Sequence, residues 1–302
     1  MKVLIAGATG LVGSAIVAQC KRNAISVHYL TTSKEKIEDK EHYKGFYWNP
    51  AKQEIDSTCF YGVDAIINLA GAPISNRWTK SYKQKILDSR LQSLHLLKQT
   101  IQKENINIKQ LISASAIGIY PNSITNYHEE NASTMSSGFL GEVAVKWEKA
   151  ADEFLELGIL VTKIRIGLVL DAEEGALPKM VSPVKYGFGA AFGTGLQWQS
   201  WIHIEDLARI FVYTLEENLG GVFNGVAPNP ITNQELTKAI ASTLEKPLWL
   251  PNIPKIAMKL ALGDMHVLLF ESQRVCSKKI EEEGFDFMYP NLMPALENLL
   301  EA

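Results

Sequence analysis

The feature that most constrains the fold is the spacing of three glycines beside the first apolar segment. Residues 3–6 form a short apolar run, rich in β-branched side chains, and Gly7, Gly10 and Gly13 follow it at intervals of three. Residues 11–22 then carry apolar side chains at helical spacing. A buried strand, a glycine-rich turn and a helix in that order predict the first β-α unit of a parallel sheet.

The same turn predicts a site for the diphosphate of a dinucleotide. Gly7 permits a tight turn, Gly10 lets a ligand approach the backbone, and Gly13 lets the helix pack closely on the strand. The helix start offers free N–H groups and a partial positive charge to phosphates. The alternative is an ordinary glycine-rich turn. On the binding hypothesis, the cofactor contacts are Gly7, Thr9, Gly10, Leu11, Val12 and Gly13.

Strand and helix patterns alternate up to about residue 170. We predict strands at 3–6, 25–30, 46–48, 63–69, 109–114 and 159–166, with helices at 11–22, 81–102 and 138–157. This order indicates an α/β fold with a doubly wound parallel sheet of the Rossmann type. Later helices are expected at 202–216, 232–244 (with Thr232 as N-cap), 277–283 and 292–300. We therefore expect a dinucleotide-binding domain at 1–170, to which segments near 196–225 return, and a smaller, mainly helical substrate lobe at 171–302.

Composition excludes several classes of partner. The net charge of −3, with no run of basic residues, argues against nucleic acid, and no apolar segment is long enough to predict a membrane span or a membrane partner. The three cysteines, Cys20, Cys59 and Cys276, are far apart, which is typical of the reducing cytoplasm and predicts neither disulfides nor a structural zinc site. The histidines show no metal-binding spacing, so no metal is expected.

The residues after the second predicted strand bear on the choice of cofactor. An Asp or Glu at this position would bind the ribose 2′-hydroxyl of NAD, but the sequence reads Thr31-Thr32-Ser33-Lys34. Hydroxyls and a lysine suit a 2′-phosphate, which favours NADP over NAD. The alternative is that these four residues are only the polar part of a surface loop.

Three further segments resemble the extended short-chain dehydrogenase/reductase family. They are Asn68-Leu69-Ala70-Gly71, Ser113-Ala114-Ser115-Ala116 and residues 201–208, which read WIHIEDLA. Residues 68–74, 77–79, 165–170 and 283–285 are similar to the family's sugar-nucleotide epimerase-like branch, whose C-terminal region has no assigned role. The resemblance implies that Leu69, Ala70, Gly71 and Ser113 lie beside the cofactor. It also implies a reactive hydroxyl at Ser115, for which a turn or cap role is the alternative.

The resemblance also implies a Tyr-x-x-x-Lys pair that this sequence lacks. The pair would fall at Leu140 and Ala144, neither of which can ionise. Glu142 and Lys146 are four residues apart on one helical face and are candidate replacements, with an ordinary surface pair as the alternative. Arg90 is a candidate for binding a carboxylate or phosphate, or for pairing with Asp88.

Two functions remain open on this sequence. The first is an NAD(P)-binding oxidoreductase or epimerase-like protein with an atypical site, acting on a small polar substrate, nucleotide-linked substrates among them. The second is a catalytically silent NADP-binding regulatory protein, since the resemblance extends to proteins linked to cell division. The resemblance further implies that two copies can pair as a homodimer. His203 is interpreted as a structural residue at a helix start, with a catalytic role as the alternative.

Overall fold

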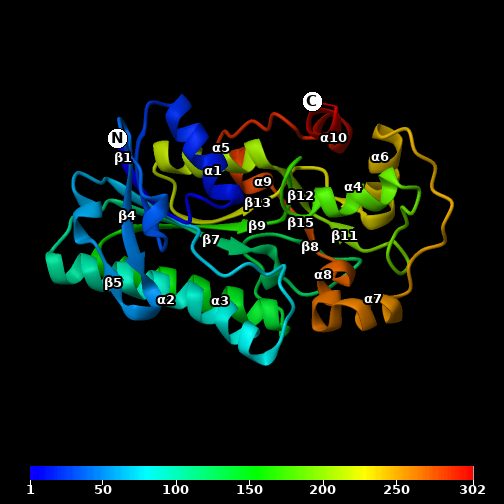
Figure 1. Ribbon diagram of the computed structural model, residues 1–302, viewed down its shortest axis with the longest axis horizontal. Helices are drawn as coiled ribbons and strands as arrows, with labels where there is room; N and C mark the ends of the chain where they lie inside the picture. Colours follow the sequence, from blue (N-terminus) through cyan, green and yellow to red (C-terminus); the bar gives the residue numbers. More distant parts are fainter. Residues whose placement is uncertain (302) are drawn as a thin grey trace.

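A computed structural model describes residues 1–301 of the protein (Figure 1). A nine-stranded sheet forms its centre. Its strands lie in the order β13-β9-β7-β6-β1-β2-β4-β3, and β5 pairs with β4. The neighbours from β13 to β4 are all parallel, whereas β3 and β5 are antiparallel to β4. The strands are β1 (Lys2–Ala6), β2 (Ser26–Thr31), β3 (Asp39–Lys40), β4 (Tyr43–Asn49), β5 (Glu54–Ile55), β6 (Ala65–Asn68), β7 (Gln110–Ala116), β9 (Leu160–Ile166) and β13 (Gly221–Gly225).

Helices cover both faces of this sheet. In Figure 1, α1 (Leu11–Arg22) and α5 (Ile204–Glu216) lie on one side, and α2 (Lys80–Glu104) and α3 (Phe139–Asp152) lie on the other. Parallel strands covered on both faces form the doubly wound architecture, so the predicted fold class is confirmed. The predicted bounds of the first helix agree with those of α1.

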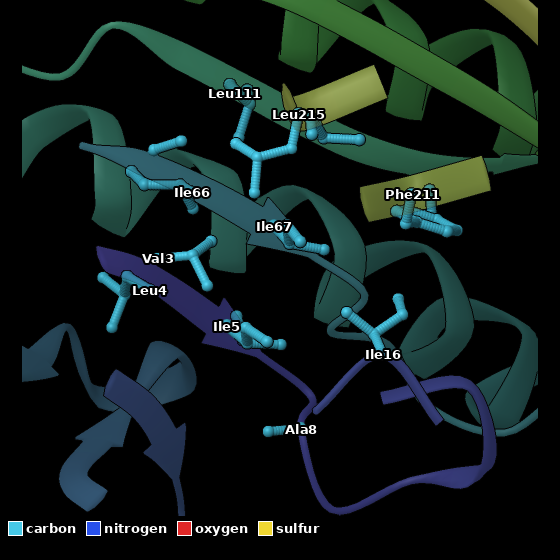
Figure 2. Packing of buried hydrophobic residues seen from close by; sticks show 14 of the residues in the cluster. Val3, Leu4, Ile5, Ala8, Ile16, Ile66, Ile67, Leu111, Phe211 and Leu215 are labelled. Carbon is cyan, nitrogen blue, oxygen red and sulfur yellow. The ribbon is translucent and has the colours of Figure 1, made fainter. Parts of the chain in front are cut away.

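The core explains why β1 and β6 are apolar at nearly every position instead of alternating. Figure 2 shows β1 and β6 lying side by side, with residues of α1 and α5 packed against them. Because each face of the sheet meets a helix, successive side chains are buried whichever way they point. Each fully buried Leu or Ile contributes roughly 2 kcal/mol. The labelled members of this core are Val3, Leu4, Ile5, Ala8, Ile16, Ile66, Ile67, Leu111, Phe211 and Leu215.

A smaller and mainly helical C-terminal lobe adjoins the sheet, as predicted (Figure 1). Its second apolar cluster joins α4, α6 and α10 through Val181, Ile240 and Leu296. Thr232 caps α6 in a reciprocal capping box with Glu235, which confirms the predicted N-cap. The lobe helices are α4 (Leu177–Lys185), α6 (Asn233–Thr243), α7 (Lys255–Leu262), α8 (Val267–Phe270), α9 (Lys278–Glu282) and α10 (Leu292–Leu300).

Three short strand pairs link the lobe to the sheet-bearing part. They are β10 (Leu168–Leu170) with β12 (Trp201–His203), β11 (Trp198–Gln199) with β14 (Ile231–Thr232), and β15 (Arg274–Val275) with β8 (Tyr127–His128). The predicted helix 202–216 was wrong at its start, because residues 201–203 pair with β10 and the helix begins at Ile204. The chain then returns to the sheet, where β13 pairs with β9. No helix within residues 1–301 is long and apolar enough to cross a membrane.

His203 caps α5 from a buried position. Its Nδ1 accepts a hydrogen bond from the backbone N–H of Glu205 at 3.1 Å, its Nε2 lies 3.1 Å from Asn298 Oδ1, and its ring stacks on Tyr289. An acceptor at Nδ1 requires the neutral ring with its proton on Nε2. Burial also lowers the pKa of His203. This arrangement is structural, in line with the first interpretation from the sequence.

We expect acid to destabilise the protein partly through His203. In the unfolded chain its pKa is about 6.5, so the unfolded state takes up more protons and the free energy of unfolding falls as pH drops through that value. Burial lowers the pKa of His28 and His128 as well, so the loss is shared. His203→Asn keeps a capping acceptor and should reduce the fall between about pH 7.5 and 5.5, measured by urea unfolding. An unchanged slope in His203→Asn would contradict this account.

Candidate functional site

The carboxyl ends of four neighbouring strands form one edge of the sheet. The register aligns Ala6 with both Leu30 and Asn68, and Asn68 with Ser113. Ligands of doubly wound folds bind outside this edge. The structure therefore brings together the predicted cofactor residues at this edge. Ser113 lies inside β7 beside the last residue of β6, and the others end or follow β1, β2 and β6, namely Gly7, Thr9, Gly10, Leu11, Val12, Gly13, Thr31, Thr32, Ser33, Lys34, Leu69, Ala70 and Gly71.

The glycine turn holds the start of α1 against the end of β1. Gly7 has φ of +92°, and a Cβ atom on it would lie 3.1 Å from the carbonyl carbon of Leu69. A Cβ atom on Gly13 would lie 2.1 Å from the carbonyl oxygen of Gly7, so no other residue fits there. Gly10 is the N-cap of α1, and no side chain in residues 1–301 caps this helix. Its first N–H groups are thus left for a ligand.

Asn68 adds an unsatisfied donor to this edge. Its side chain is fully buried at the end of β6, and its Oδ1 accepts from the N–H of Ala70 at 3.4 Å. Its Nδ2 has no hydrogen-bond partner among the described residues. Buried donors are nearly always paired in folded proteins, so a ligand atom is the natural acceptor. The sequence resemblance contained Asn68 but gave it no role of its own.

The end of β2 and the turn after it carry polar side chains. Thr31 is buried and its Oγ1 accepts from the N–H of Ser33 at 3.2 Å, which forms a local turn. Thr32 and Lys34 are exposed, and the Lys34 ammonium lies 5.0 Å from the ring centre of Tyr47. Two hydroxyls and an ammonium therefore lie on the side of the edge toward β2.

Arg90 lies directly beside Gly71. A Cβ atom on Gly71 would come within 3.0 Å of the guanidinium carbon, so the glycine leaves room for the arginine. Arg90 Nη1 donates to the carbonyl oxygens of Ala72 and Ile86, and the guanidinium stacks on Trp147. Burial lowers the pKa of Arg90 to about 10.

Arg90 has no counter-charge within residues 1–301. The alternative pairing with Asp88 is absent there, since Asp88 accepts from Gln84 instead. A half-buried cation without a carboxylate partner is electrostatically incomplete, and an anionic ligand would complete it.

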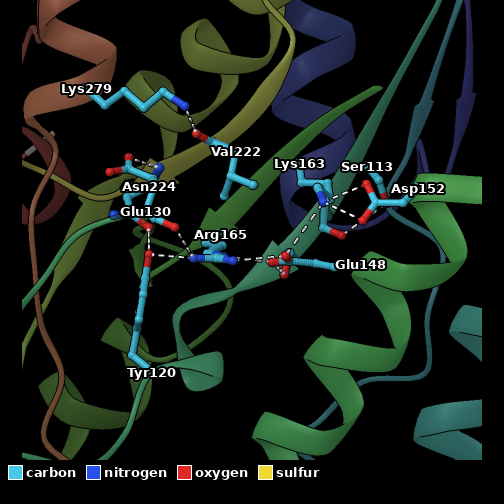
Figure 3. Close-up of polar contacts among 12 residues, drawn as sticks. Ser113, Tyr120, Glu130, Glu148, Asp152, Lys163, Arg165, Val222, Asn224 and Lys279 are labelled. Carbon is cyan, nitrogen blue, oxygen red and sulfur yellow. Dashed lines mark hydrogen bonds and ion pairs between the residues drawn. The ribbon is translucent and has the colours of Figure 1, made fainter. Parts of the chain in front are cut away.

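Ser115 lies in a buried polar cluster with Glu148 and Arg165, and Figure 3 shows the last two residues. Its Oγ donates to Glu148 Oε1 at 2.7 Å. Arg165 donates two hydrogen bonds to the same carboxylate, from Nε to Oε1 at 2.8 Å and from Nη2 to Oε2 at 3.0 Å. The hydroxyl proton of Ser115 is therefore engaged, and only its lone pairs remain for another group.

The cluster continues from Arg165 through Tyr120 to Asn224 on β13, at one side of the sheet (Figure 3). Arg165 Nη1 donates to the Tyr120 hydroxyl at 2.9 Å, and that hydroxyl donates to Asn224 Oδ1 at 2.7 Å. Burial raises the pKa of Tyr120 to about 12, and burial also raises the pKa of Glu130, which accepts from the N–H of Asn224. Tyr120 is thus fixed in the core, so the network serves to hold β7, β9 and β13 together.

Glu142 and Lys146 lie on the exposed face of α3. Lys146 lines a cavity of about 460 Å³ between α2 and α3, whereas Glu148, on the buried face of the same helix, contacts Ser115. The structure does not bring Glu142 and Lys146 together with Ser115, because the buried and exposed faces of a helix point apart. Of the expected Tyr and Lys positions, Ala144 is buried and Leu140 packs against Gly118 at the end of β7.

Glu271 is a titratable residue that sequence reasoning missed. It comes from the C-terminal lobe and lies at the start of α3, where a Cβ atom on Gly138 would be 3.8 Å from Glu271 Oε1. Gln273 Nε2 donates to its Oε2 at 3.3 Å, and the N–H of Ser272 donates to Asn122 Oδ1 in the loop after β7. Burial raises the pKa of Glu271. No local pattern marks this glutamate, since only the folded lobe carries it to the helix that lacks the Tyr and Lys.

Comparison with known proteins identifies the family. The model of the NAD-dependent epimerase/dehydratase family matches residues 3–138, and a domain of unknown function, DUF1731, matches residues 253–299. An epimerase family protein of Staphylococcus aureus (strain N315) is 37% identical over 99% of this chain and 98% of its own. The chain belongs to the epimerase family. The epimerase family protein YfhF of Bacillus subtilis (strain 168) is 36% identical, again over 99% and 98%.

Solved structures agree with this placement. The human epimerase family protein SDR39U1 (isoform 2), crystallised with NADPH, is 28% identical and superposes with a TM-score of 0.86 over 100% of this chain and 99% of its own. The UDP-glucose 4-epimerase of Thermus thermophilus has a TM-score of 0.78 at 17% identity over 100% and 98%, which shows a shared fold. The resemblance to sugar-nucleotide epimerase-like proteins is thereby confirmed.

We expect Glu148→Ala to reduce the free energy of unfolding by about 3–5 kcal/mol, because it leaves the buried Arg165 guanidinium without its counter-charge. Urea unfolding measures the change. Asp152→Asn is the matched control on the same helix, since its pair with Lys163 is partly solvated and worth about 1 kcal/mol or less. Equal effects of the two substitutions would contradict the structural role given to the Glu148–Arg165 pair.

Proposed function

We propose that this epimerase-family chain binds NADP(H) at the carboxyl edge of its sheet. We further propose that it acts as an oxidoreductase or epimerase-like enzyme on a small polar substrate. The observation that carries the proposal is the uncapped start of α1 beside the positive-φ Gly7. Those free N–H groups suit a diphosphate, and the unpaired Nδ2 of Asn68 offers a further donor at the same edge.

Each part of the cofactor has residues that fit it. The amides of residues 9–13 would hold the diphosphate, and residues 69–71 would form a wall beside the nicotinamide ribose. Thr32, Ser33 and Lys34 would hold a ribose 2′-phosphate, which favours NADP over NAD. The human relative crystallised with NADPH supports the same choice. When bound, the nicotinamide supplies hydride transfer.

Proton transfer must come from a group other than the usual Tyr and Lys. Leu140 and Ala144 cannot ionise, and Ser115 would have to break its bond to Glu148 before it could donate elsewhere, at a cost of about 1–3 kcal/mol. We assign the acid/base role to Glu271, because burial raises the pKa of its carboxyl and so favours the protonated form that can donate a proton. Glu271 lies at the start of α3, and α3 corresponds to the helix that carries the ionisable pair in the wider family.

Arg90 indicates the charge of the substrate. Its guanidinium is held beside Gly71 and has no carboxylate partner within residues 1–301. A carboxylate or phosphate on the substrate would supply the missing charge. Nucleotide-linked substrates carry such phosphates, so they are the first class to test. The three cysteines are free and buried, which fits a reducing cytoplasm, where we place the protein.

We expect NADPH to bind more tightly than NADH, and Lys34→Gln to weaken NADPH binding by roughly 5- to 10-fold while leaving NADH binding unchanged. The reason is that only NADPH carries the phosphate that Lys34 would pair with. Fluorescence titration or calorimetry measures both affinities. Lys21→Gln, an exposed lysine in the last turn of α1 and so near the opposite ends of the strands, is the control. If neither nucleotide binds at millimolar concentration, the proposed function is wrong.

We expect Glu271→Gln to lower kcat at least about 100-fold without changing NADPH affinity, because an amide cannot exchange a proton. The assay is turnover of a panel of nucleotide sugars and small carbonyl compounds with NADPH or NADP⁺. Glu142→Gln serves as the control on the exposed face of α3. Full activity in Glu271→Gln would remove the assigned role. Tight NADPH binding with no turnover across the panel would favour the catalytically silent alternative, which the non-ionisable Leu140 and Ala144 also fit.

A further inference from the structure

The end of the C-terminal lobe remote from the N-terminal strands has an unusual surface. It consists of residues 185–196 and 246–263, which we call the lobe tip. Figure 1 shows the connection from α6 to α7 running around this end of the molecule. The two segments lie side by side: the N–H of Gly193 donates to the carbonyl oxygen of Ile253, and that of Ile253 donates to Ala191.

The lobe tip exposes many large apolar side chains. Trp249 is 78% exposed, Ile256 75% and Leu260 82%. The tip holds seven of the nineteen exposed large hydrophobic side chains in residues 1–301, although it is only about a tenth of the chain. Concentrations of this kind mark interaction surfaces. The seven are Tyr186, Phe188, Leu196, Trp249, Leu250, Ile256 and Leu260.

Helix α7 forms one part of this surface and packs poorly on the rest of the protein. It begins after Pro254, ends at Gly263, and contains no buried residue, whereas α4, α6 and α10 each bury an apolar face. Ile256 and Leu260 are four residues apart and share one face, and Lys255 and Lys259 lie beside them at the same spacing. An apolar stripe flanked by lysines is typical of helices that lie in a membrane interface.

The lobe tip is basic, although two acidic residues adjoin it. It contains Lys185, Lys246, Lys255 and Lys259, all exposed, and no Asp or Glu; the exposed Glu245 and Asp264 border it, and Asp264 pairs with Lys83. A basic surface with exposed Trp, Tyr and Phe complements anionic lipid headgroups above an apolar layer. A symmetric contact between two copies of the tip would bring like charges together, so a second copy is a poorer match.

We propose that the lobe tip docks the protein on an anionic membrane surface. The apolar side chains of α7 and Trp249 enter the headgroup region, and the four lysines pair with lipid phosphates. This contact is peripheral, so it requires no membrane-spanning helix. It uses residues apart from the glycine turn, and its test does not depend on the proposed cofactor or on activity.

Vesicle co-sedimentation of the full chain tests the proposal. We expect binding to vesicles containing phosphatidylglycerol, at least about 10-fold weaker binding to pure phosphatidylcholine, and release at high salt. Lys255→Gln with Lys259→Gln should weaken binding about 25-fold, at roughly 5-fold for each lysine. Ile256→Ser with Leu260→Ser should weaken it at least about 10-fold, because both apolar side chains are lost from the headgroup region. Because these side chains are exposed, the midpoint of thermal unfolding should not change.

The matched control lies on the N-terminal domain, where Tyr61→Ser with Lys52→Gln removes an exposed aromatic and an exposed lysine. It should bind vesicles as the unaltered protein does. Equal binding to both vesicle types, or full binding by the α7 variants, would overturn the proposal. A solution dimer that the α7 variants dissociate, without any vesicle binding, would also overturn it and assign the tip to contact between copies.

Discussion

A Cβ atom on Gly13 would lie 2.1 Å from the carbonyl oxygen of Gly7, and this close approach sets the geometry on which the site depends. It brings α1 down onto the end of β1 and points the free N–H groups of the helix at the sheet edge. The parallel register then lines up the ends of β1, β2, β6 and β7 beside them. A helix start, an unpaired Asn68 amide and an uncompensated Arg90 thus lie along one edge, the first placed by the glycine contact and the other two by β6 and α2.

The buried Glu148–Arg165 pair stabilises the fold, and it also makes the Ser115 hydroxyl less available to a ligand. It takes the hydroxyl proton of Ser115 and, through Tyr120 and Asn224, ties β7 and β9 to β13. A buried pair of charges is stable only when its oxygens and N–H groups are hydrogen-bonded. Here Arg165 donates to both carboxylate oxygens of Glu148. The proposed function therefore assigns proton transfer to a group outside this cluster, Glu271 from the C-terminal lobe, whose pKa is raised by burial at the start of α3.

The C-terminal lobe has two surfaces of different character. One meets the sheet-bearing domain through β15 and β8 and through Ser272 bound to Asn122, and it carries Glu271 to α3. The other, the lobe tip, is basic and exposes seven large apolar side chains. A single small lobe can thus complete the proposed site on one side and hold the protein at a surface on the other.

The sequence by itself determined the fold class, the glycine turn, the bounds of α1 and the Thr232 cap, because each follows from residues close together in the chain. Periodicity of apolar residues and the steric freedom of glycine act over one or two turns of helix. Tertiary structure decided the rest. Residues 201–203 became a strand because β10 offered a partner, Glu142 and Lys146 were separated from Ser115 by the burial of α3, and Glu271 reached α3 from a distant part of the sequence. Such contacts depend on how whole elements pack, and no local pattern records that packing.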